Sequence, residues 1–426
     1  MGGCAPQPAT PASAARPKRD EWQRVRDQFD VSRDWVHMSG FLLASHPKPV
    51  RDAIEAYRRG LDADPAQYFE AHQGVPKADR ASSEPGAEEL VRMAAALYLG
   101  AAASEIALTD STTMGLGTIY CGLPLDVGDE IVTTEHDHYS THEALRLAAL
   151  RTGATMRKAR LYDRGESAAA EPMVRALIAA LSPATKLVAV TWVHSSTGVK
   201  LPLRAMADAI ADVNASRHPA RRILFCVDAV HGLGVEDETM ASLGCDFFIA
   251  GCHKWLFGPR GTGIVWGKPE HWPLLRPTIP HFGNDGFLAW LADKPPPPTS
   301  ADMMTPGGFH SFEHRWALGE AFAFHMQIGK AKVKERIHAL SRQCKEGLAV
   351  MRNVTLHTPR EDDVSAGIIT FEVAGLPPEL AVQRLHEARI VATPTPYRES
   401  YVRVAPGLLC SEEDVEAVLR SVRSMV

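Results

Sequence analysis

The distribution of apolar and polar residues predicts alternating strands and helices through the middle of the chain. Short apolar runs of strand length occur at residues 106–108, 130–133, 187–192, 223–227, 247–250 and 264–266. Between them, residues 144–151, 173–180 and 206–213 have apolar residues at helical spacing. Strands that alternate with helices in this way form a mostly parallel sheet covered on both faces. The predicted fold class is therefore α/β.

The flanking patterns divide the chain into four predicted parts. Residues 1–19, rich in Ala and Pro, are expected to be a disordered tail. Residues 20–48 form an N-terminal segment, with a short charged amphipathic stretch followed by extended chain. Residues 49–313 form a large domain around the sheet. Residues 314–426 begin with a long helical stretch and form a smaller α+β domain, with strands at 366–371 and 401–404.

Composition excludes several classes of protein. The formal net charge of −5 gives no basic field for nucleic acid. No apolar stretch approaches the ~20 residues that span a bilayer, so we expect no membrane partner. Seven cysteines, an odd number in a long chain, indicate reduced thiols rather than a disulfide framework.

The N-terminus leaves two locations open. It has no charged start followed by an apolar core, so the chain as written is expected in the cytoplasm. However, Gly3 and Cys4 precede an Ala/Pro-rich run that resembles what remains after a signal segment is trimmed. That alternative predicts a periplasmic or exported protein.

The strongest chemical signal is a lysine close behind a buried-strand pattern. Lys254 follows the apolar run 247–250 and precedes a Gly/Pro-rich turn. Partial desolvation favours the free amine, which can act as a nucleophile or form a Schiff base, although a surface lysine at a strand end gives the same pattern. Upstream, the run 223–227 ends in Asp228. Pyridoxal 5′-phosphate (PLP) needs such a pair, a lysine for the Schiff base and an acid for its pyridine nitrogen.

These stretches carry a family resemblance. The His-Lys-Trp-Leu at residues 253–256 and the Pro-Arg-Gly at 259–261 resemble the class V aminotransferase superfamily of fold-type I PLP-dependent enzymes, in particular its isopenicillin N epimerase-like branch. The resemblance runs from about residue 34 to the C-terminus. It implies that the large domain binds PLP, that Lys254 is catalytic, and that residues 20–48 reach the substrate pocket.

The resemblance assigns cofactor contacts to loops behind the strands. Thr112 and Thr113 are expected at the phosphate, since a helix start with hydroxyls can bind an anion, although an ordinary N-cap looks the same. His138 is expected to stack on the pyridine ring, with His136 as the alternative. Ser195 is expected at the phenolic oxygen, although a plain polar turn also explains it.

Three more cofactor contacts follow from the resemblance. Asp228 matches the acid at the pyridine nitrogen, His231 lies near the phenolic side, and His253 resembles the family's phosphate-contacting histidine. Many members have Ser or Thr three residues before the lysine, where this chain has Gly251. Phosphate contacts are therefore left to the backbone, to His253, or to residues 305–309 of a second subunit, and the family's cross-subunit contacts imply a homodimer.

The substrate site is expected at the predicted strand 401–404. Arg403 resembles the arginine with which the family binds the substrate α-carboxylate, and its planar fork suits a carboxylate. A strand-end ion pair is the alternative. Tyr397 and Arg398, in the loop before it, are expected to contact the substrate side chain. The expected partner is a small molecule of amino-acid type.

The superfamily divides into several reactions, and the sequence does not name the substrate. Cysteine desulfurases carry a nucleophilic cysteine in the loop before the arginine, whereas residues 393–401 contain none. The stretches 135–140 and 307–316 resemble an exported subgroup that includes a pyoverdine-maturation enzyme. We therefore expect epimerase- or aminotransferase-like chemistry, or oxidative deamination or decarboxylation. A C–S or other β-lyase is the alternative.

A rival from another class is a metal-dependent enzyme. His136, Asp137 and His138 are residue types that bind zinc or iron. We assign no metal ligand, because no third cluster has matching spacing. A PLP-binding protein without catalysis is a further alternative, against which the joint presence of Lys254 and Arg403 argues.

Overall fold

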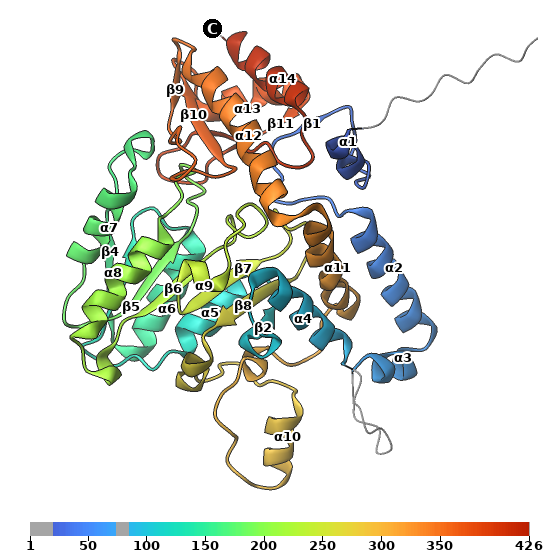
Figure 1. Cartoon of the computed structure of the whole chain (residues 1–426), viewed down its shortest axis with the longest axis vertical. Coiled ribbons are helices and arrows are strands. Elements are labelled where there is room, and N and C mark those ends of the chain that lie inside the picture. The colour runs from blue at the N-terminus through green and yellow to red at the C-terminus, as the bar shows by residue number, and fades with distance from the viewer. Residues whose placement is uncertain (1–19, 74–84, 426) are drawn as a thin grey trace, which may run out of the picture.

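The computed structural model of the protein describes residues 20–73 and 85–425. Its centre is a seven-stranded sheet with the strand order β2-β8-β7-β6-β5-β3-β4 (Figure 1). The pairs from β7 to β4 are parallel, and β8 runs antiparallel to both of its neighbours. The strands are β2 (Ile106–Thr109), β3 (Glu130–Thr134), β4 (Thr155–Ala159), β5 (Thr185–Thr191), β6 (Leu224–Asp228), β7 (Phe247–Gly251) and β8 (Gly263–Gly267).

The sheet is buried on both faces, and successive residues of its strands are apolar because they pack alternately on one face and the other. In β5, Leu187 and Ala189 belong to one hydrophobic cluster, whereas Val188 and Val190 belong to the cluster on the opposite face. A strand covered on both sides is apolar throughout, which is why the short apolar runs predicted it. The covering helices are α4 (Ala87–Leu99), α5 (Thr112–Gly122), α6 (Tyr139–Thr152), α7 (Ala170–Ala179), α8 (Leu203–Ala215) and α9 (Met240–Leu243).

The C-terminal part contains a smaller antiparallel sheet with its own hydrophobic cluster. Its strand order is β12-β13-β10-β9, and Arg403 of β13 lies opposite Thr370 of β10. Ser411 and Asp414 form a capping box at the start of α14. The elements are α11 (Phe312–Ile328), α12 (Lys330–Ala349), β9 (Val354–Leu356), β10 (Ile369–Val373), α13 (Pro378–Glu387), β11 (Ile390–Val391), β12 (Thr393–Pro394), β13 (Val402–Val404) and α14 (Glu412–Arg423).

The N-terminal segment runs between these two parts. Strand β1 (Val36–His37) pairs in parallel with β11, and Met38 belongs to the C-terminal cluster. Three residues later, Phe41 packs into the core of the large sheet. The remaining helices are α1 (Glu21–Arg26), α2 (Lys48–Ala63), α3 (Pro65–His72) and α10 (Asn284–Leu291), which projects from the body in Figure 1. Short 3₁₀ turns are Ala103–Glu105, Gly165–Ser167, Pro219–Arg221, Pro269–Leu274 and Asp302–Met304.

The α/β class and the mostly parallel sheet are confirmed, and each strand predicted for this sheet is present. The pattern did not predict β4, because this edge strand exposes Thr155 and Arg157 to solvent and so lacks an apolar run. The tail predicted at residues 1–19 lies outside the described residues. Within the described residues, no helix is both long and apolar enough to cross a membrane.

Candidate active site

Lys254 lies just behind the carboxyl end of β7, where the chain turns toward β8. Its Nζ is 3.3 Å from Nε2 of His231. Desolvation lowers the pKa of Lys254 to about 8, an effect that the charge of Asp228 opposes and that of Arg403 reinforces. A lysine with this pKa supplies a useful fraction of free amine near neutral pH, so it can act as a nucleophile.

Asp228 ends the neighbouring strand β6 and is 2% exposed. One carboxylate oxygen accepts a bond of 3.2 Å from the backbone N–H of Val230, and the other accepts 3.3 Å from Oγ1 of Thr141. Burial raises the pKa of Asp228 to about 6, although the Val230 N–H and the charge of Lys254 act against this. A buried acid with few donors is well placed to hold a cationic group such as a protonated pyridine nitrogen.

The N-terminus of α5 forms the next wall of the site and explains Gly251. The backbone N–H of Gly251 donates to Oγ1 of Thr112 at 2.8 Å. A Cβ on Gly251 would lie only 2.9 Å from that oxygen, so a Ser or Thr at this position would require Thr112 to shift. Thr112 fills the space instead, and its own hydroxyl proton can donate to an anion at the helix start. Thr113 is exposed at the same helix start.

Two histidines near the end of β3 have different surroundings. His138 caps α6, and burial lowers its pKa, helped by the charges of Lys254 and Arg403. His136 instead stacks on Tyr162, with ring centroids 3.7 Å apart and planes 7° from parallel. The charges of Lys254 and Arg403 therefore act on His138, and its stacking on the cofactor stays a prediction. His253 is half-buried, and burial, Lys254 and Arg260 lower its pKa.

The candidate metal cluster does not assemble. Both carboxylate oxygens of Asp137 are engaged, since they accept from Oγ1 of Thr133 and the backbone N–H groups of Thr134 and Thr191, each at 2.7 Å. Asp137 thus ties the end of β3 to the end of β5. Across residues 20–73 and 85–425, no group of three or more His, Cys, Asp or Glu side chains could hold a metal ion. The geometry gives no support to the metal-dependent alternative.

Arg403 provides a buried positive charge on the C-terminal side of the site. The residue is 6% exposed, and burial lowers its pKa to about 10. Its guanidinium donates to the carbonyl of Ser195 at 2.9 Å and to Oγ1 of Thr393 at 3.1 Å, and it lies 4.3 Å above the ring of Phe41. Within the described residues it has no carboxylate partner, so it remains able to bind the carboxylate of a ligand.

Ser195 and Tyr397 meet beside Arg403. The Oγ of Ser195 lies 2.6 Å from the hydroxyl of Tyr397, and burial raises the pKa of that phenol to about 12. Arg398, the next residue, is exposed to solvent. The structure therefore brings Ser195, Tyr397 and Arg403 together and leaves Arg398 at the rim.

Comparison with known proteins shows the family of the chain. Residues 44–394 match the model of the family described as Aminotransferase class-V. The chain belongs to the class V aminotransferase family. Similar relatives include isopenicillin N epimerase of Streptomyces clavuligerus, 24% identical over 84% of this chain and 85% of that protein. A cysteine desulfurase of Klebsiella pneumoniae strain 342 is 26% identical over 82% of each chain.

Solved structures show the same fold. A mutant of C-DES with glycine covalently linked to its PLP cofactor superposes with a TM-score of 0.79 at 20% identity, over 93% of this chain and 98% of that one. The apo cysteine desulfurase of Thermococcus onnurineus NA1 gives 0.79 at 22% identity, over 97% and 99%. This member of the class V aminotransferase family therefore has the fold-type I architecture and is a PLP-dependent enzyme. The lowered pKa of Lys254, the buried carboxylate of Asp228 and the helix start at Thr112 beside Gly251 fit that cofactor.

Three side chains that contact the site were not singled out from the sequence. Thr141 donates a hydrogen bond to Asp228, Phe41 lies beneath Arg403, and the indole of Trp255 lies 3.3 Å from Nδ1 of His231. Phe41 and Trp255 stand in stretches that the family resemblance drew on, but nothing local shows which distant group each one meets. Thr141 gives no sequence signal of its own.

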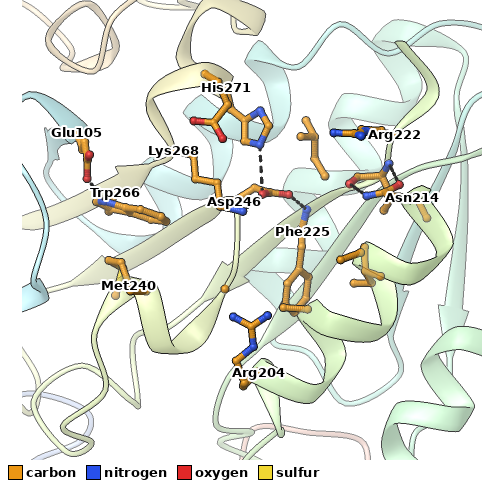
Figure 2. A pocket seen from close by; sticks show the side chains of 18 of the residues that line it. Glu105, Arg204, Asn214, Arg222, Phe225, Met240, Asp246, Trp266, Lys268 and His271 are labelled. Carbon is orange, nitrogen blue, oxygen red and sulfur yellow. Dashed lines mark hydrogen bonds and ion pairs between the residues drawn. The ribbon is translucent and has the colours of Figure 1, made fainter. Parts of the chain in front are cut away.

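A separate hollow of about 750 Å³ lies at the other end of the central strands, away from Lys254 (Figure 2). It surrounds Asp246, which directly precedes β7, whereas Lys254 follows the other end of that strand. Within it, Asp246 contacts Lys268 at 2.6 Å and His271 at 3.2 Å (Figure 2). The hollow is thus remote from the chemistry of Lys254.

Proposed function

We propose that this PLP-dependent enzyme binds an amino acid, or a natural product derived from one, and transfers a proton at its Cα through Lys254. The observation that carries the proposal is that two cationic groups, the buried Arg403 and the partly exposed Lys254, share one site. Arg403 has no carboxylate partner among the described residues, and its charge acts on the amine of Lys254. A ligand carboxylate supplies the missing anion and places the neighbouring Cα within the site.

The side chains around Lys254 have the chemistry to hold PLP. Asp228 suits the pyridine nitrogen, and the start of α5 suits the phosphate. When bound, PLP withdraws electrons from the bonds of the substrate Cα. The proposed cofactor contacts are Thr112, Thr113, His138, Ser195, Asp228, His231, His253 and Lys254.

The protein groups then divide the remaining work. Arg403 fixes the carboxylate, and Tyr397, which bonds Ser195 beside it, faces the rest of the substrate. Arg398 stays a proposed contact at the exposed rim. The free amine of Lys254 accepts the proton from Cα and returns it to an acceptor carbon. Proton transfer of this kind is shared by epimerase- and aminotransferase-like reactions and also begins oxidative deamination. Decarboxylation breaks a different bond at the same carbon.

Two measurements test the proposal. Borohydride reduction of the yellow holoenzyme followed by peptide mapping should place the cofactor on Lys254, and Lys254→Ala should lose the adduct. In D₂O, the wild type should exchange the Cα hydrogen of its substrate within a panel of amino acids, whereas Lys254→Ala should not. Protein that remains colourless with added PLP, or a Lys254→Ala variant of full activity, sinks the proposal.

The relatives named cysteine desulfurase favour C–S cleavage, or another β-elimination, as the second candidate. Desulfuration needs a reactive thiol, but the loop between β12 and β13 has no cysteine. Burial raises the pKa of each of the six cysteines in the described chain, so none is poised as a thiolate. Assays for sulfide, alanine and pyruvate from cysteine and cystine separate these reactions. Pyruvate with sulfide supports a β-lyase, and alanine with sulfide supports a desulfurase.

We also propose a homodimer, as the family resemblance implies. On α4, Leu90, Met93 and Leu97 form an exposed apolar stripe, with Leu97 72% exposed. Phe309 is 86% exposed, while Thr305 is buried and its Oγ1 accepts from the N–H of Leu108 within its own chain. A cross-subunit phosphate contact therefore falls to the exposed end of residues 305–309. Sedimentation velocity tests the dimer, and Leu97→Glu should weaken it.

A further inference from the structure

Trp255 follows Lys254 directly and contacts the histidine that faces it. The indole Nε1 of Trp255 lies 3.3 Å from Nδ1 of His231, and Nε2 of His231 lies 3.3 Å from Nζ of Lys254. Trp255 is 4% exposed and His231 is 5% exposed, so water does not readily replace either contact. The contact between Trp255 and His231 is buried, and it continues through His231 to the partly exposed Lys254.

The chemistry of these groups fixes where the proton of His231 sits. An indole N–H can only donate, so Nδ1 of His231 accepts the bond from Trp255 and carries no proton. In the neutral imidazole the proton is then on Nε2, the nitrogen that faces Lys254. An N–H at this position can donate to a free amine, whereas an ammonium group offers no lone pair to accept it.

We propose that Trp255 is a positioning residue that fixes the tautomer of His231 and thereby favours the unprotonated nitrogen of Lys254. The inference rests on the proposed function, in which this nitrogen holds PLP and moves the Cα proton. Burial keeps His231 neutral by lowering its pKa well below the ordinary value. The charged and titratable groups that act on His231 or Lys254 are Asp228, His138, His253 and Arg403.

The indole ring also connects this contact to the sheet that carries Arg403. A Cβ on Gly367 would lie 2.6 Å from Cη2 of Trp255, and one on Gly407 would lie 3.3 Å from its Cζ3. Gly367 shortly precedes β10, and Gly407 follows β13, the strand of Arg403. The backbone next to β10 and β13 therefore packs against the indole ring of Trp255.

The test compares Trp255→Phe with Trp266→Phe as a matched control. Both variants remove a buried indole donor, but Nε1 of Trp266 bonds Glu105 at 2.8 Å, toward the remote edge of the sheet. Without the indole N–H of Trp255, neutral His231 can carry its proton on Nδ1 instead. The lone pair of Nε2 then faces Lys254 and can accept a hydrogen bond from its protonated nitrogen. Titration of the holoenzyme's cofactor absorbance against pH reports the protonation of the Lys254 nitrogen. The midpoint of this titration should rise by roughly 0.5–1 pH unit in Trp255→Phe. It should stay unchanged in Trp266→Phe.

Two further arms keep the inference falsifiable. Gly367→Ala must displace the indole, because the new Cβ would overlap it, and should shift the midpoint in the same direction. Nitrogen-15 NMR of histidine-labelled apoprotein should show His231 unprotonated at Nδ1, with the signal assigned by its loss in His231→Asn. A protonated Nδ1 in the wild type, or an unshifted midpoint in both Trp255→Phe and Gly367→Ala, overturns the inference. The NMR measurement needs no cofactor. It therefore identifies the tautomer of His231 even if the protein does not bind PLP and the proposed function is wrong.

Discussion

The hydroxyl groups of Ser195 and Tyr397 lie 2.6 Å apart, which joins the end of β5 to the loop between β12 and β13. Ser195 also accepts a hydrogen bond from Arg403 through its backbone carbonyl. The sequence placed Ser195 with the cofactor and Tyr397 with the substrate. In the structure Ser195 contacts both Tyr397 and Arg403, so a change in the loop of Tyr397 should affect the loop that follows β5.

The first prediction concerns this hydrogen bond. Ser195→Ala and Tyr397→Phe should each destabilise the apoprotein, and a double-mutant cycle should give a coupling of about 1 kcal/mol because both variants remove the same bond. Urea unfolding of the four proteins measures it. Tyr401→Phe, whose hydroxyl bonds Glu399 instead, should be additive with Ser195→Ala. Additivity in the Ser195–Tyr397 cycle would show that the two hydroxyls do not interact in solution.

The second prediction separates two arginines that the sequence assigned to the substrate. Arg403→Gln should raise KM for the amino-acid substrate by roughly 30-fold to 1,000-fold, since it removes a charged bond to the carboxylate. Arg398→Gln should change KM by less than about threefold, because the side chain is exposed and its charge is screened. Steady-state kinetics on the substrate found by Cα exchange provides the comparison. Equal effects of the two variants would place the carboxylate at the rim.

The success of the sequence prediction differs between residues for physical reasons. A charged residue within or directly after an apolar run can be recognised from the sequence alone. This pattern identified Lys254, Asp228 and Arg403 as candidates. The partners of these residues are set by contacts between distant segments. No local pattern shows that Trp255 meets His231, or that His136 turns away to stack on Tyr162.

The third prediction concerns a stability cost at Asp228. Its folded-state pKa of about 6 lies above the ordinary value, so the folded apoprotein binds a proton that the unfolded chain releases. This lowers stability as pH rises from about 4 to 6, and the loss persists at higher pH. Asp228→Asn should therefore stabilise the apoprotein at pH 7 by about 1–3 kcal/mol, with no gain at pH 4.

Asp246→Asn is the matched control of opposite sign. Burial alone would raise the pKa of Asp246, but His271 and Lys268 hold it below the ordinary value. Its contribution is therefore present at neutral pH and lost in acid, so the Asn variant should be less stable than wild type at pH 7. Chemical unfolding of both variants at pH 4 and pH 7 tests the pair. A destabilised Asp228→Asn at pH 7 would mean that the carboxylate has a partner the geometry does not show.

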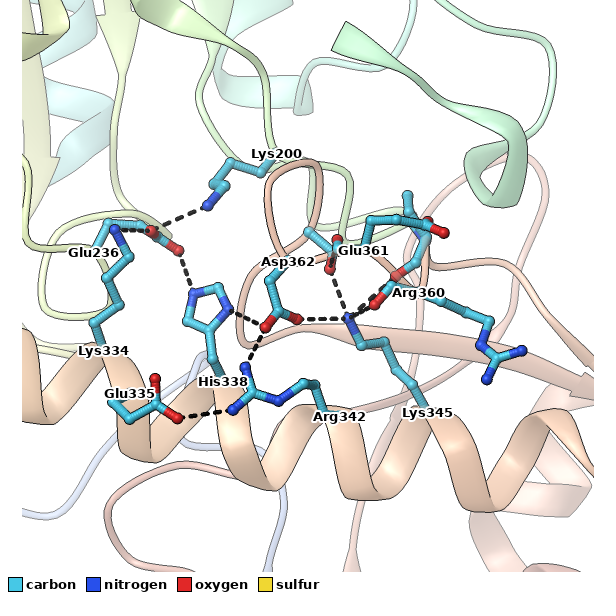
Figure 3. A network of polar contacts seen from close by, with 12 residues as sticks. Lys200, Glu236, Lys334, Glu335, His338, Arg342, Lys345, Arg360, Glu361 and Asp362 are labelled. Atoms are coloured by element: carbon cyan, nitrogen blue, oxygen red, sulfur yellow. Dashed lines mark hydrogen bonds and ion pairs between the residues drawn. The ribbon is translucent and has the colours of Figure 1, made fainter.

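The fourth prediction concerns a charged network between α12 and its neighbouring loops (Figure 3). Glu236 is 3% exposed and contacts Lys200 at 3.1 Å, His338 at 2.8 Å and Lys334 at 3.3 Å. His338 in turn faces Asp362 at 3.6 Å, so the network joins the loop before α9 to the loop before β10. Glu236→Gln leaves Lys200 buried without its anion and should cost about 3–5 kcal/mol of stability at pH 7.

The pH dependence gives this prediction a sign. Burial alone would raise the pKa of Glu236, but His338, Lys200 and Lys334 hold it below the ordinary value, so its contribution is lost as pH falls below about 4. The difference between wild type and Glu236→Gln in urea unfolding should therefore shrink in acid. Glu335→Gln, also on the network but with a side chain 71% exposed, should cost less than about 0.5 kcal/mol. Adding Lys200→Met to Glu236→Gln should recover part of the loss, because it removes the stranded charge. Equal losses in the free energy of unfolding for Glu236→Gln and Glu335→Gln would show that the burial of Glu236 does not strengthen its ion pairs.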